Sequence, residues 1–247
     1  MQQEGTSINK FISDTGYCSR READLFIEYG RVTLNGKEAR KGNRTLPGDI
    51  VKVDGQLVKN KTKPVYIALN KPKGITCTTD LKDRTNIITY INFKSRIFPI
   101  GRLDKLSEGL IFLTNDGDIV NKILRSANNH EKEYIVTVDK ALNSDFIKRM
   151  GEGVKILGTI TKKCFVKQEG EKKFRIILTE GLNRQIRRMC ETLGYKVVSL
   201  VRIRIMNITL KNIEKGKWRF FTENELSVIN NMTVQSNNAS SENGMDE

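Results

Sequence analysis

Histidine is nearly absent from this chain of 247 residues, and its cysteines are isolated. His130 is the sole histidine, and the four cysteines, Cys18, Cys77, Cys164 and Cys190, form no C-x-x-C pair. A zinc site needs clustered cysteine and histidine ligands, and a His-dependent triad needs a histidine beside its partners. We therefore expect no metal centre and four reduced thiols without a catalytic role.

Long apolar runs are also missing. No segment approaches the roughly 20 apolar residues that a membrane-spanning helix needs. The first residues, Met1–Gly5, show no charged segment followed by an apolar core, so no signal peptide is expected. These absences favour a cytoplasmic protein that has no contact with a membrane.

Acidic residues are too few to balance the basic ones. The chain has 43 Lys and Arg against 29 Asp and Glu, a net charge of +14. Residues 64–220 carry most of the excess, with 31 basic and 16 acidic residues, whereas residues 221–247 hold five acidic residues and no basic one. Such a balance favours a polyanionic partner, usually nucleic acid, although membrane-surface and merely soluble proteins can share it.

The first 55 residues predict a small module of two helices and a hairpin. Ser19 and Glu22 fit a capping box at the start of a helix that should run to about Tyr29. An amphipathic turn or two precedes it at residues 8–16. Asn35-Gly36 is a strong hairpin signal, and residues 48–55 alternate like a strand.

The rest of the chain predicts a mixture of strands and helices without a repeating βαβ order, which favours a largely antiparallel sheet with helices packed on it. The expected strands are 65–69, 110–114, 133–138, 174–178, 197–210 with a break, and 218–221. The expected helices are 118–124, 144–150 and 183–193. Residues 231–247 are rich in Asn and Ser and poor in large apolar residues, so they should be disordered.

An acidic residue, Asp104, lies between a glycine-containing segment and the apolar run Leu110–Leu113. A lone aspartate in such a position is usually a turn cap, because its short side chain bonds to nearby backbone. By itself, this residue does not distinguish a turn cap from a catalyst.

Two further segments carry side chains that could serve in catalysis or binding. Lys132 and Tyr134 share one face of an expected strand, where the tyrosine could simply pack under the lysine stem. Residues 183–193 predict an amphipathic helix whose basic side holds Arg184, Arg187 and Arg188. On its own, that helix would be interpreted as an exposed basic surface.

Together, these motifs resemble the RsuA/RluB/RluE/RluF family of pseudouridine synthases. Residues 101–117 follow the family pattern GRLD-x-x-S-x-G-L-x-x-L-T-N-x-G, residues 132–134 follow K-x-Y, and residues 180–188 resemble E-G-x-x-R-Q-x-R-R. The resemblance covers nearly all of residues 7–226. Segments such as 121–124 and 204–207 look most like the RluF branch.

The resemblance implies a role for each matched residue. Asp104 would be the catalytic nucleophile or base, and Arg187 would pair with it and favour its ionised form. Tyr134 would stack on the target base and could accept a proton from it. Ile186 would line the pocket, while the remaining candidates would contact RNA: Arg102, Lys132, Arg184 and Arg188.

Two other segments add candidate RNA contacts. Residues 7–55 resemble an S4 RNA-binding domain, in which Arg20, Arg21 and Arg31 would contact phosphates. For each arginine alone, a solvated position is equally plausible. The turn at residues 70–74 resembles the family's N-K-P-x-G, and its Lys71 and Lys73 could either touch RNA or serve the turn.

The resemblance also implies the architecture. We expect an α+β protein with an N-terminal extension (1–6), a small S4-like αL domain (7–57) and a linker (58–63). A catalytic domain (64–230) should follow, with a mixed, largely antiparallel β-sheet flanked by helices, the pseudouridine synthase fold. The tail (231–247) should be disordered.

The implied reaction breaks the N1–C1′ bond of a uridine and rejoins the base through C5, which needs no cofactor. The implied substrate is a uridine of 23S ribosomal RNA, handled by a monomer; whether a tRNA is a second substrate stays open. Two alternatives stay open. One is a non-catalytic RNA-binding or ribosome-assembly protein; the other is a glycosidase-like hydrolase, which usually needs a second carboxylate near the first.

Overall fold

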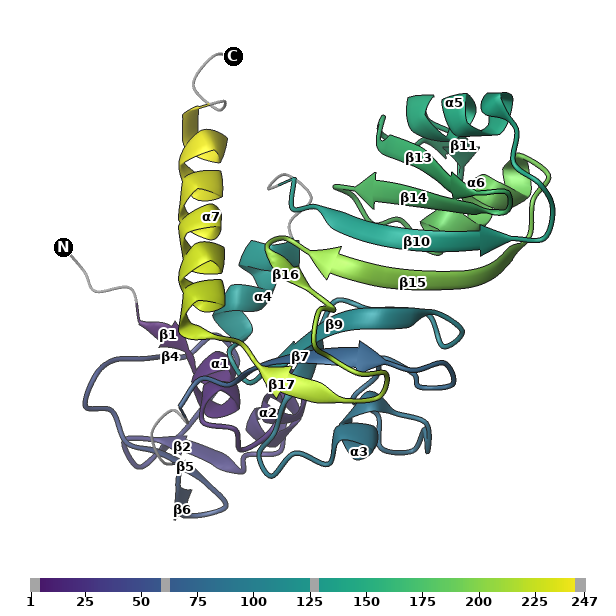
Figure 1. Cartoon of the computed structure of the whole chain (residues 1–247). Coiled ribbons are helices and arrows are strands. Elements are labelled where there is room, and N and C mark those ends of the chain that lie inside the picture. Colours follow the sequence, from purple (N-terminus) through teal and green to yellow (C-terminus); the bar gives the residue numbers. More distant parts are fainter. Residues whose placement is uncertain (1–4, 59–62, 125–128, 243–247) are drawn as a thin grey trace. The chain divides into compact units, whose positions relative to one another are not determined.

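The computed structural model describes residues 5–58, 63–124 and 129–242, with side chains up to residue 232 (Figure 1). The chain forms two compact units. Unit 1 contains the described residues up to Val65 together with Lys94–Arg96 and Asn115–Gly117. Unit 2 contains Tyr66–Phe93, Ile97–Thr114 and the described residues from Asp118 onward. Most of the expected linker, residues 59–62, lies outside the described residues.

Unit 1 holds two helices and short antiparallel strands. The helices are α1 (Ile8–Asp14) and α2 (Arg20–Glu28). A sheet in the order β3-β2-β5-β6 is built from β2 (Val32–Leu34), β3 (Lys37–Glu38), β5 (Val51–Val53) and β6 (Gln56–Leu57). A separate pair joins β1 (Thr6–Ser7) to β4 (Arg44–Thr45). Buried side chains of both helices and of the sheet form one core.

The local signals of this unit are confirmed. Ser19 accepts a hydrogen bond from the Glu22 amide at 3.1 Å, and the Ser19 amide donates to the Glu22 carboxylate at 2.7 Å. Asn35 and Gly36 both have positive φ, at 51° and 80°. That conformation suits a tight hairpin between twisted strands, which is why Asn-Gly predicts one.

Unit 2 is built around a large sheet. Nine strands within the described residues form it: β7 (Tyr66–Lys71), β8 (Phe98–Ile100), β9 (Glu108–Thr114), β10 (Lys132–Val138), β13 (Phe165–Gly170), β14 (Lys173–Leu178), β15 (Val197–Ile205), β16 (Ile208–Thr209) and β17 (Trp218–Phe220). The other elements are α3 (Ile87–Ile91), α4 (Gly117–Leu124), α5 (Ser144–Glu152), α6 (Gln185–Thr192), α7 (Glu223–Glu242) and the hairpin β11 (Lys155–Ile156) with β12 (Thr159–Ile160).

The sheet runs in the order β13-β14-β10-β15-β9-β7-β17, with β16 beside β15 and β8 beside β9. In Figure 1, β10 and β15 lie side by side as long neighbouring arrows. Among the described strands of this sheet, only β15 and β9 pair in parallel; the other pairs are antiparallel. The expected α+β class with a mixed, largely antiparallel sheet is therefore confirmed.

A bulge in β15 decides which of its side chains face the same way as Tyr134. Tyr134 pairs with Arg202 and Glu133 pairs with Arg204, so Ile203 is an extra residue between them. An extra residue breaks the alternation of side chains along a strand. The Arg202 side chain therefore lies on the same face of the sheet as Tyr134. The Arg204 side chain lies with Glu133 on the opposite face and bonds to the Glu133 carboxylate at 2.6 Å.

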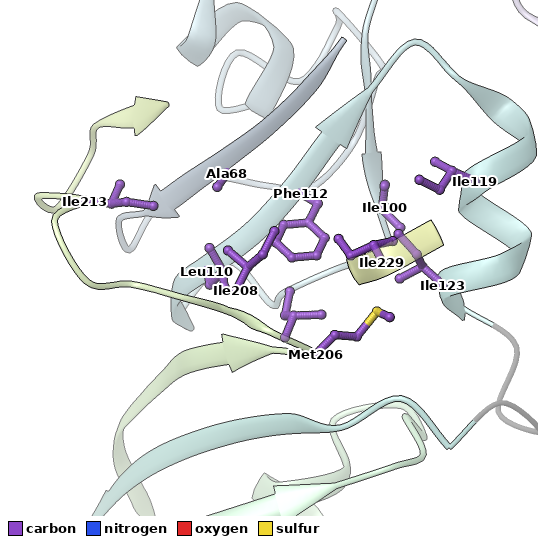
Figure 2. Packing of buried hydrophobic residues seen from close by; sticks show 11 residues of the cluster. Ala68, Ile100, Leu110, Phe112, Ile119, Ile123, Met206, Ile208, Ile213 and Ile229 are labelled. Atoms are coloured by element: carbon purple, nitrogen blue, oxygen red, sulfur yellow. The ribbon is translucent and has the colours of Figure 1, made fainter. Parts of the chain in front are cut away.

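The main core of unit 2 packs helices and loops against the sheet (Figure 2). Phe112 of β9 lies at its centre and is fully buried. Its neighbours come from β7, β8, β9, α4, the segment from the end of β15 to the loop after β16, and α7: Ala68, Ile100, Leu110, Ile119, Ile123, Ile205, Met206, Ile208, Ile213 and Ile229. Ile229 ties the first turns of α7 to this core.

Helix α7 continues past residue 231, where the sequence predicts disorder to begin. The helix begins after Thr222, whose hydroxyl accepts from the Glu225 amide at 3.1 Å. No Pro or Gly follows until Gly244, so no residue in this stretch is a strong helix breaker. The last expected tail residues, 243–247, lie outside the described residues. The short elements α3, β8, β11, β12 and β13 were not predicted, because their segments lack sustained periodicity.

The close approach of β9 to β15 at Gly109 can be tested by adding one methyl group. A Cβ at Gly109, whose φ is +104°, would lie 2.2 Å from the Arg202 carbonyl oxygen. Gly109→Ala should therefore lower the free energy of unfolding by more than about 4 kcal/mol, measured by urea titration.

Gly158→Ala is the matched control, because Gly158 also has a positive φ of +79° but no atom within 4 Å of the place that the added methyl group would take. It should cost only about 1–2 kcal/mol of backbone strain. Equal losses in the two variants would contradict the tight contact at Gly109.

Candidate functional site

A cavity of about 920 Å³ opens in unit 2 beside β10 and β15. Its walls come from the loop before β9, from β10, from the segment between β14 and α6, and from β15. Two carboxylates, Asp104 and Glu180, line it. They face seven basic side chains: Arg102, Lys105, Lys132, Lys162, Arg184, Arg187 and Arg202. The cavity is therefore strongly positive.

Asp104 lies on the loop between β8 and β9 and keeps about a third of its side chain exposed. Its Oδ2 atom is 3.7 Å from Arg184 Nη1 and 3.7 Å from Arg187 Nε. The loop is held from behind, since the Leu103 amide donates to the buried thiol of Cys77 at 3.3 Å. The Ser107 amide also closes a turn by donating to the Asp104 carbonyl at 2.9 Å. The carboxylate thus projects from a fixed turn.

Arg187 is buried at the start of α6, and the structure brings it to Asp104 as the sequence predicts. Its Nη2 donates to the Ser107 hydroxyl at 3.2 Å, and its Nη1 approaches the Val197 carbonyl at 3.4 Å. The Nε atom, which faces Asp104, has no hydrogen-bond partner within the described residues. Burial lowers the pKa of Arg187, and the charge of Asp104 opposes that shift. The guanidinium is anchored at two nitrogens and leaves the third for the carboxylate.

Arg184 is a second partner of Asp104 that sequence reasoning assigned only to phosphate contact. It caps α6 with a left-handed backbone, φ 50°. The loop before it is fastened by the buried Gln185, whose amide donates to the Glu180 carboxylate at 2.7 Å and whose oxygen accepts from the Leu182 amide at 3.0 Å. Helical periodicity placed Arg184 on the exposed side, but the helix begins one residue later and the turn directs it toward the cavity.

Lys132 and Tyr134 of β10 both line the cavity. Tyr134 is 8% exposed. Lys132 Nζ donates to the His130 carbonyl at 3.2 Å, and burial, together with the nearby charge of Arg202, lowers the pKa of Lys132. Arg102 and the buried Ile186 line the cavity as well. Arg188 instead bonds to Asn183 and lies outside the described lining.

The two lysines of the turn after β7 differ in exposure. Lys71 is fully buried, and its ammonium donates to the carbonyls of Pro72 and Ile75 at 3.0 and 2.9 Å. This burial is incompatible with RNA contact, so the turn uses Lys71 internally. Lys73 is about half exposed and lies 3.6 Å from Glu108.

In unit 1, Arg20 and Arg21 are exposed at the first turn of α2. Arg31 is exposed too, but its guanidinium makes two bonds to Asp54, at 2.8 and 2.5 Å, and lies 4.2 Å from the centre of the Phe26 ring. Arg31 is therefore partly engaged by contacts within unit 1, whereas Arg20 and Arg21 are exposed to solvent.

Arg202 was missed by sequence reasoning. It lines the cavity from β15 while remaining 4% exposed. Within the stretch VVSLVRIRI, a charged residue in an otherwise apolar central strand is the signal that could have identified it.

Membrane-spanning and metal-binding features are both absent from the described residues. No helix there is long and apolar enough to cross a membrane. No group of three or more His, Cys, Asp or Glu side chains there could hold a metal ion.

Comparison with known proteins agrees with this architecture. Residues 65–192 match the family profile of RNA pseudouridylate synthases, and residues 7–51 match that of the S4 domain. The "Dual-specificity RNA pseudouridine synthase RluF" of Shigella flexneri is 60% identical over 89% of this chain and 76% of its own length. The "Ribosomal large subunit pseudouridine synthase B" of Buchnera aphidicola subsp. Schizaphis graminum is 34% identical over 91% of this chain and 93% of its own. Among solved structures, a pseudouridylate synthase aligns with TM-score 0.66 and 27% identity over 91% of this chain and 99% of the other.

The anchoring of Arg187 can be tested through Ser107, which is fully buried. Ser107→Ala removes the hydroxyl that accepts from Nη2, so the free energy of unfolding should fall by about 1–2 kcal/mol. Urea unfolding measures the change. Ser199→Ala on β15 is the control and should stay within about 0.5 kcal/mol of the parent; a matching loss there would remove the special role of Ser107.

Proposed function

The chain belongs to the family of RNA pseudouridylate synthases and is an enzyme that isomerises uridine in RNA; on that basis we propose that Asp104 is its catalytic residue and that its targets are uridines of 23S ribosomal RNA and of a tRNA. The observation that carries the assignment of Asp104 is its carboxylate on a fixed turn in a positive cavity, 3.7 Å from two arginines. Family membership decides against the non-catalytic alternative.

The choice of RNA rests on the relatives. One relative's name specifies the large ribosomal subunit, and the name of the more similar one specifies dual specificity. We infer that a protein with two classes of RNA target recognises folded RNA close to the uridine. The positive cavity and the S4 domain are suited to binding such folded RNA.

The uridine must leave its stack to enter the cavity, at a cost of a few kcal/mol. Tyr134 then stacks on the base, since it lines the cavity and an aromatic ring can stack on any base. Its phenol oxygen accepts the proton that C5 must lose, while the hydroxyl's own proton passes to water. Ile186 adds apolar contact on the cavity wall.

Asp104 then acts on the sugar, by attacking C1′ or by removing the proton at C2′. In either route the N1–C1′ bond breaks and its electron pair stays with the uracil. The base turns and C5 bonds to C1′. In the first route the Asp104 carboxylate leaves C1′ as this bond forms, and in the second it returns its proton to C2′. The C5 proton then leaves and N1 gains a proton. Substrate and product are isomers, so the reaction requires no redox partner or group donor. Arg187 orients the carboxylate for this step, since its Nε lies 3.7 Å from Oδ2 of Asp104.

The surrounding cations bind the RNA backbone. Arg102, Lys132 and Arg184 act at the cavity, and Lys73 and Arg188 act outside it. Arg20 and Arg21 of the S4 domain contact phosphates, and Arg31 does so after exchanging Asp54 for phosphate. We assign the S4 domain to residues 7–57 and the catalytic domain to 64–230.

The enzyme works in the cytoplasm, where its RNA substrates are. We propose that it works as a monomer. The hydrolase alternative lacks support, since the other cavity carboxylate, Glu180, is engaged by the Lys162 amide and by Gln185.

The assignment of Asp104 is tested with RNA that carries tritium at C5 of uridine. The parent enzyme should release tritium, and Asp104→Asn should lower the rate by at least about 10⁴-fold, because no other group replaces the carboxylate. Asp145→Asn on α5, whose carboxylate pairs with Arg149 instead, should keep the parent rate. Release by Asp104→Asn near the parent rate would remove Asp104 from its role.

The targets are tested by mapping pseudouridine in total RNA after deletion of the gene. Pseudouridine should disappear from a 23S ribosomal RNA position and from a tRNA position, and both should return when the parent gene, but not its Asp104→Asn variant, is restored. Loss from small-subunit RNA alone would contradict the proposed target.

A further inference from the structure

Arg202 carries a buried positive charge for which the protein itself supplies little compensation. Its Nε donates to the Leu110 carbonyl at 2.6 Å. Its Nη2 is shielded from water and has no hydrogen-bond partner among the described residues, and no carboxylate there forms an ion pair with it. Leaving a buried guanidinium so incompletely bonded is energetically unfavourable. Such a cost points to a ligand that offsets it.

The backbone around Arg202 holds the guanidinium rigidly. Gly109 lets β9 approach the Arg202 backbone in parallel, because any side chain there would collide with it. That approach brings the Leu110 carbonyl of β9 to the guanidinium. The charge is therefore preorganised before a substrate arrives.

The position of Arg202 relates it to the base rather than to the RNA backbone. Arg202 is directly opposite Tyr134 on neighbouring antiparallel strands, and both side chains line the cavity. Side chains of such a pair start about 5 Å apart on one face. Because Tyr134 is proposed to stack on the uracil, the guanidinium would lie next to that base, whereas the exposed Arg102 and Arg184 are better suited to phosphates.

We propose that Arg202 is a catalytic residue that stabilises the uracil anion formed when the N1–C1′ bond breaks. This proposal rests on the function proposed above. As the bond breaks, its electron pair passes to N1 and spreads over the two carbonyl oxygens of the uracil. The guanidinium faces this developing charge with fixed positive charge and N–H donors, and the charge disappears again when C5 bonds to C1′. Lys132, on the same wall, adds to the positive field.

The test distinguishes three roles of Arg202: stabilising the leaving uracil, binding RNA and maintaining the fold. Arg202→Met keeps much of the side-chain volume and removes the charge. Its single-turnover rate of pseudouridine formation should fall about 100-fold or more, the usual loss for a preorganised donor, while its affinity for the same RNA stays near that of the parent. Arg202→Lys should be intermediate, because it keeps a charge without the planar donor set.

RNA with 5-fluorouridine at the target gives the decisive comparison. Fluorine withdraws electrons, so the fluorinated base leaves more easily and needs less stabilisation. The rate of glycosidic cleavage, followed by mass spectrometry of digested RNA, should therefore fall by a smaller factor in Arg202→Met with 5-fluorouridine than with uridine. A purely structural role would slow both substrates equally.

Arg204→Met is the matched control on the same strand. Arg204 bonds to Glu131 and Glu133 on the opposite face, and Glu133 retains Arg175 when Arg204 is removed. The folded control should react at the parent rate. Thermal melting checks that each variant folds, and if Arg202→Met does not, Arg202→Lys decides by the same substrate comparison.

Three results would overturn the role of Arg202: a parent-like rate in folded Arg202→Met, a loss fully explained by weaker RNA binding, or equal slowing with both substrates. Failure of the proposed function would look different, because the parent enzyme would then form no pseudouridine or Asp104→Asn would remain active.

Discussion

The parallel pairing of β9 with β15 joins the two halves of the catalytic sheet, and the candidate site depends on it. On one side lie β13, β14 and β10; on the other lie β7 and β17. The loop that carries Asp104 leads into β9, while Arg202 is on β15. At Gly109 any side chain would collide with the Arg202 backbone, so only glycine permits this approach. A change at this junction would move the carboxylate, the guanidinium and the core around Phe112 together.

Positive charge is concentrated in the cavity at a cost to the free protein. Seven basic side chains face two carboxylates there, and one carboxylate is committed to fastening the loop before α6. Like charges at close range repel, which lowers the pKa of Lys132 beside Arg202 and adds to the effect of burial. A bound polyanion relieves this repulsion, so the feature that destabilises the empty site favours RNA in it. The same argument explains why Arg202 can remain without a carboxylate.

Local sequence signals predicted the structure correctly where a single short segment determines the conformation. The capping box at Ser19 and the Asn35-Gly36 hairpin follow from hydrogen bonds and backbone angles within a few residues. Prediction was weaker where contacts between distant segments determine burial or the length of an element. Lys71 looks like a surface lysine of a turn, yet the packing of the sheet buries it completely. Helix α7 extends further than its composition suggests, because its start is tied to the core through Ile229.

By itself, the sequence determined the family, the α+β class and the identity of the acid on which the chemistry is proposed to rest, because these follow from contiguous motifs. Through the resemblance, it also predicted that Arg187 pairs with Asp104. Only the tertiary structure decided that Arg184 is a second partner of Asp104 and that Arg202 is buried against the cavity. The first depends on where a turn passes into α6, and the second depends on a bulge in β15 and on a glycine of a strand about 90 residues earlier. Such relations between distant segments leave no periodic pattern in the chain, since they arise only when the strands are paired.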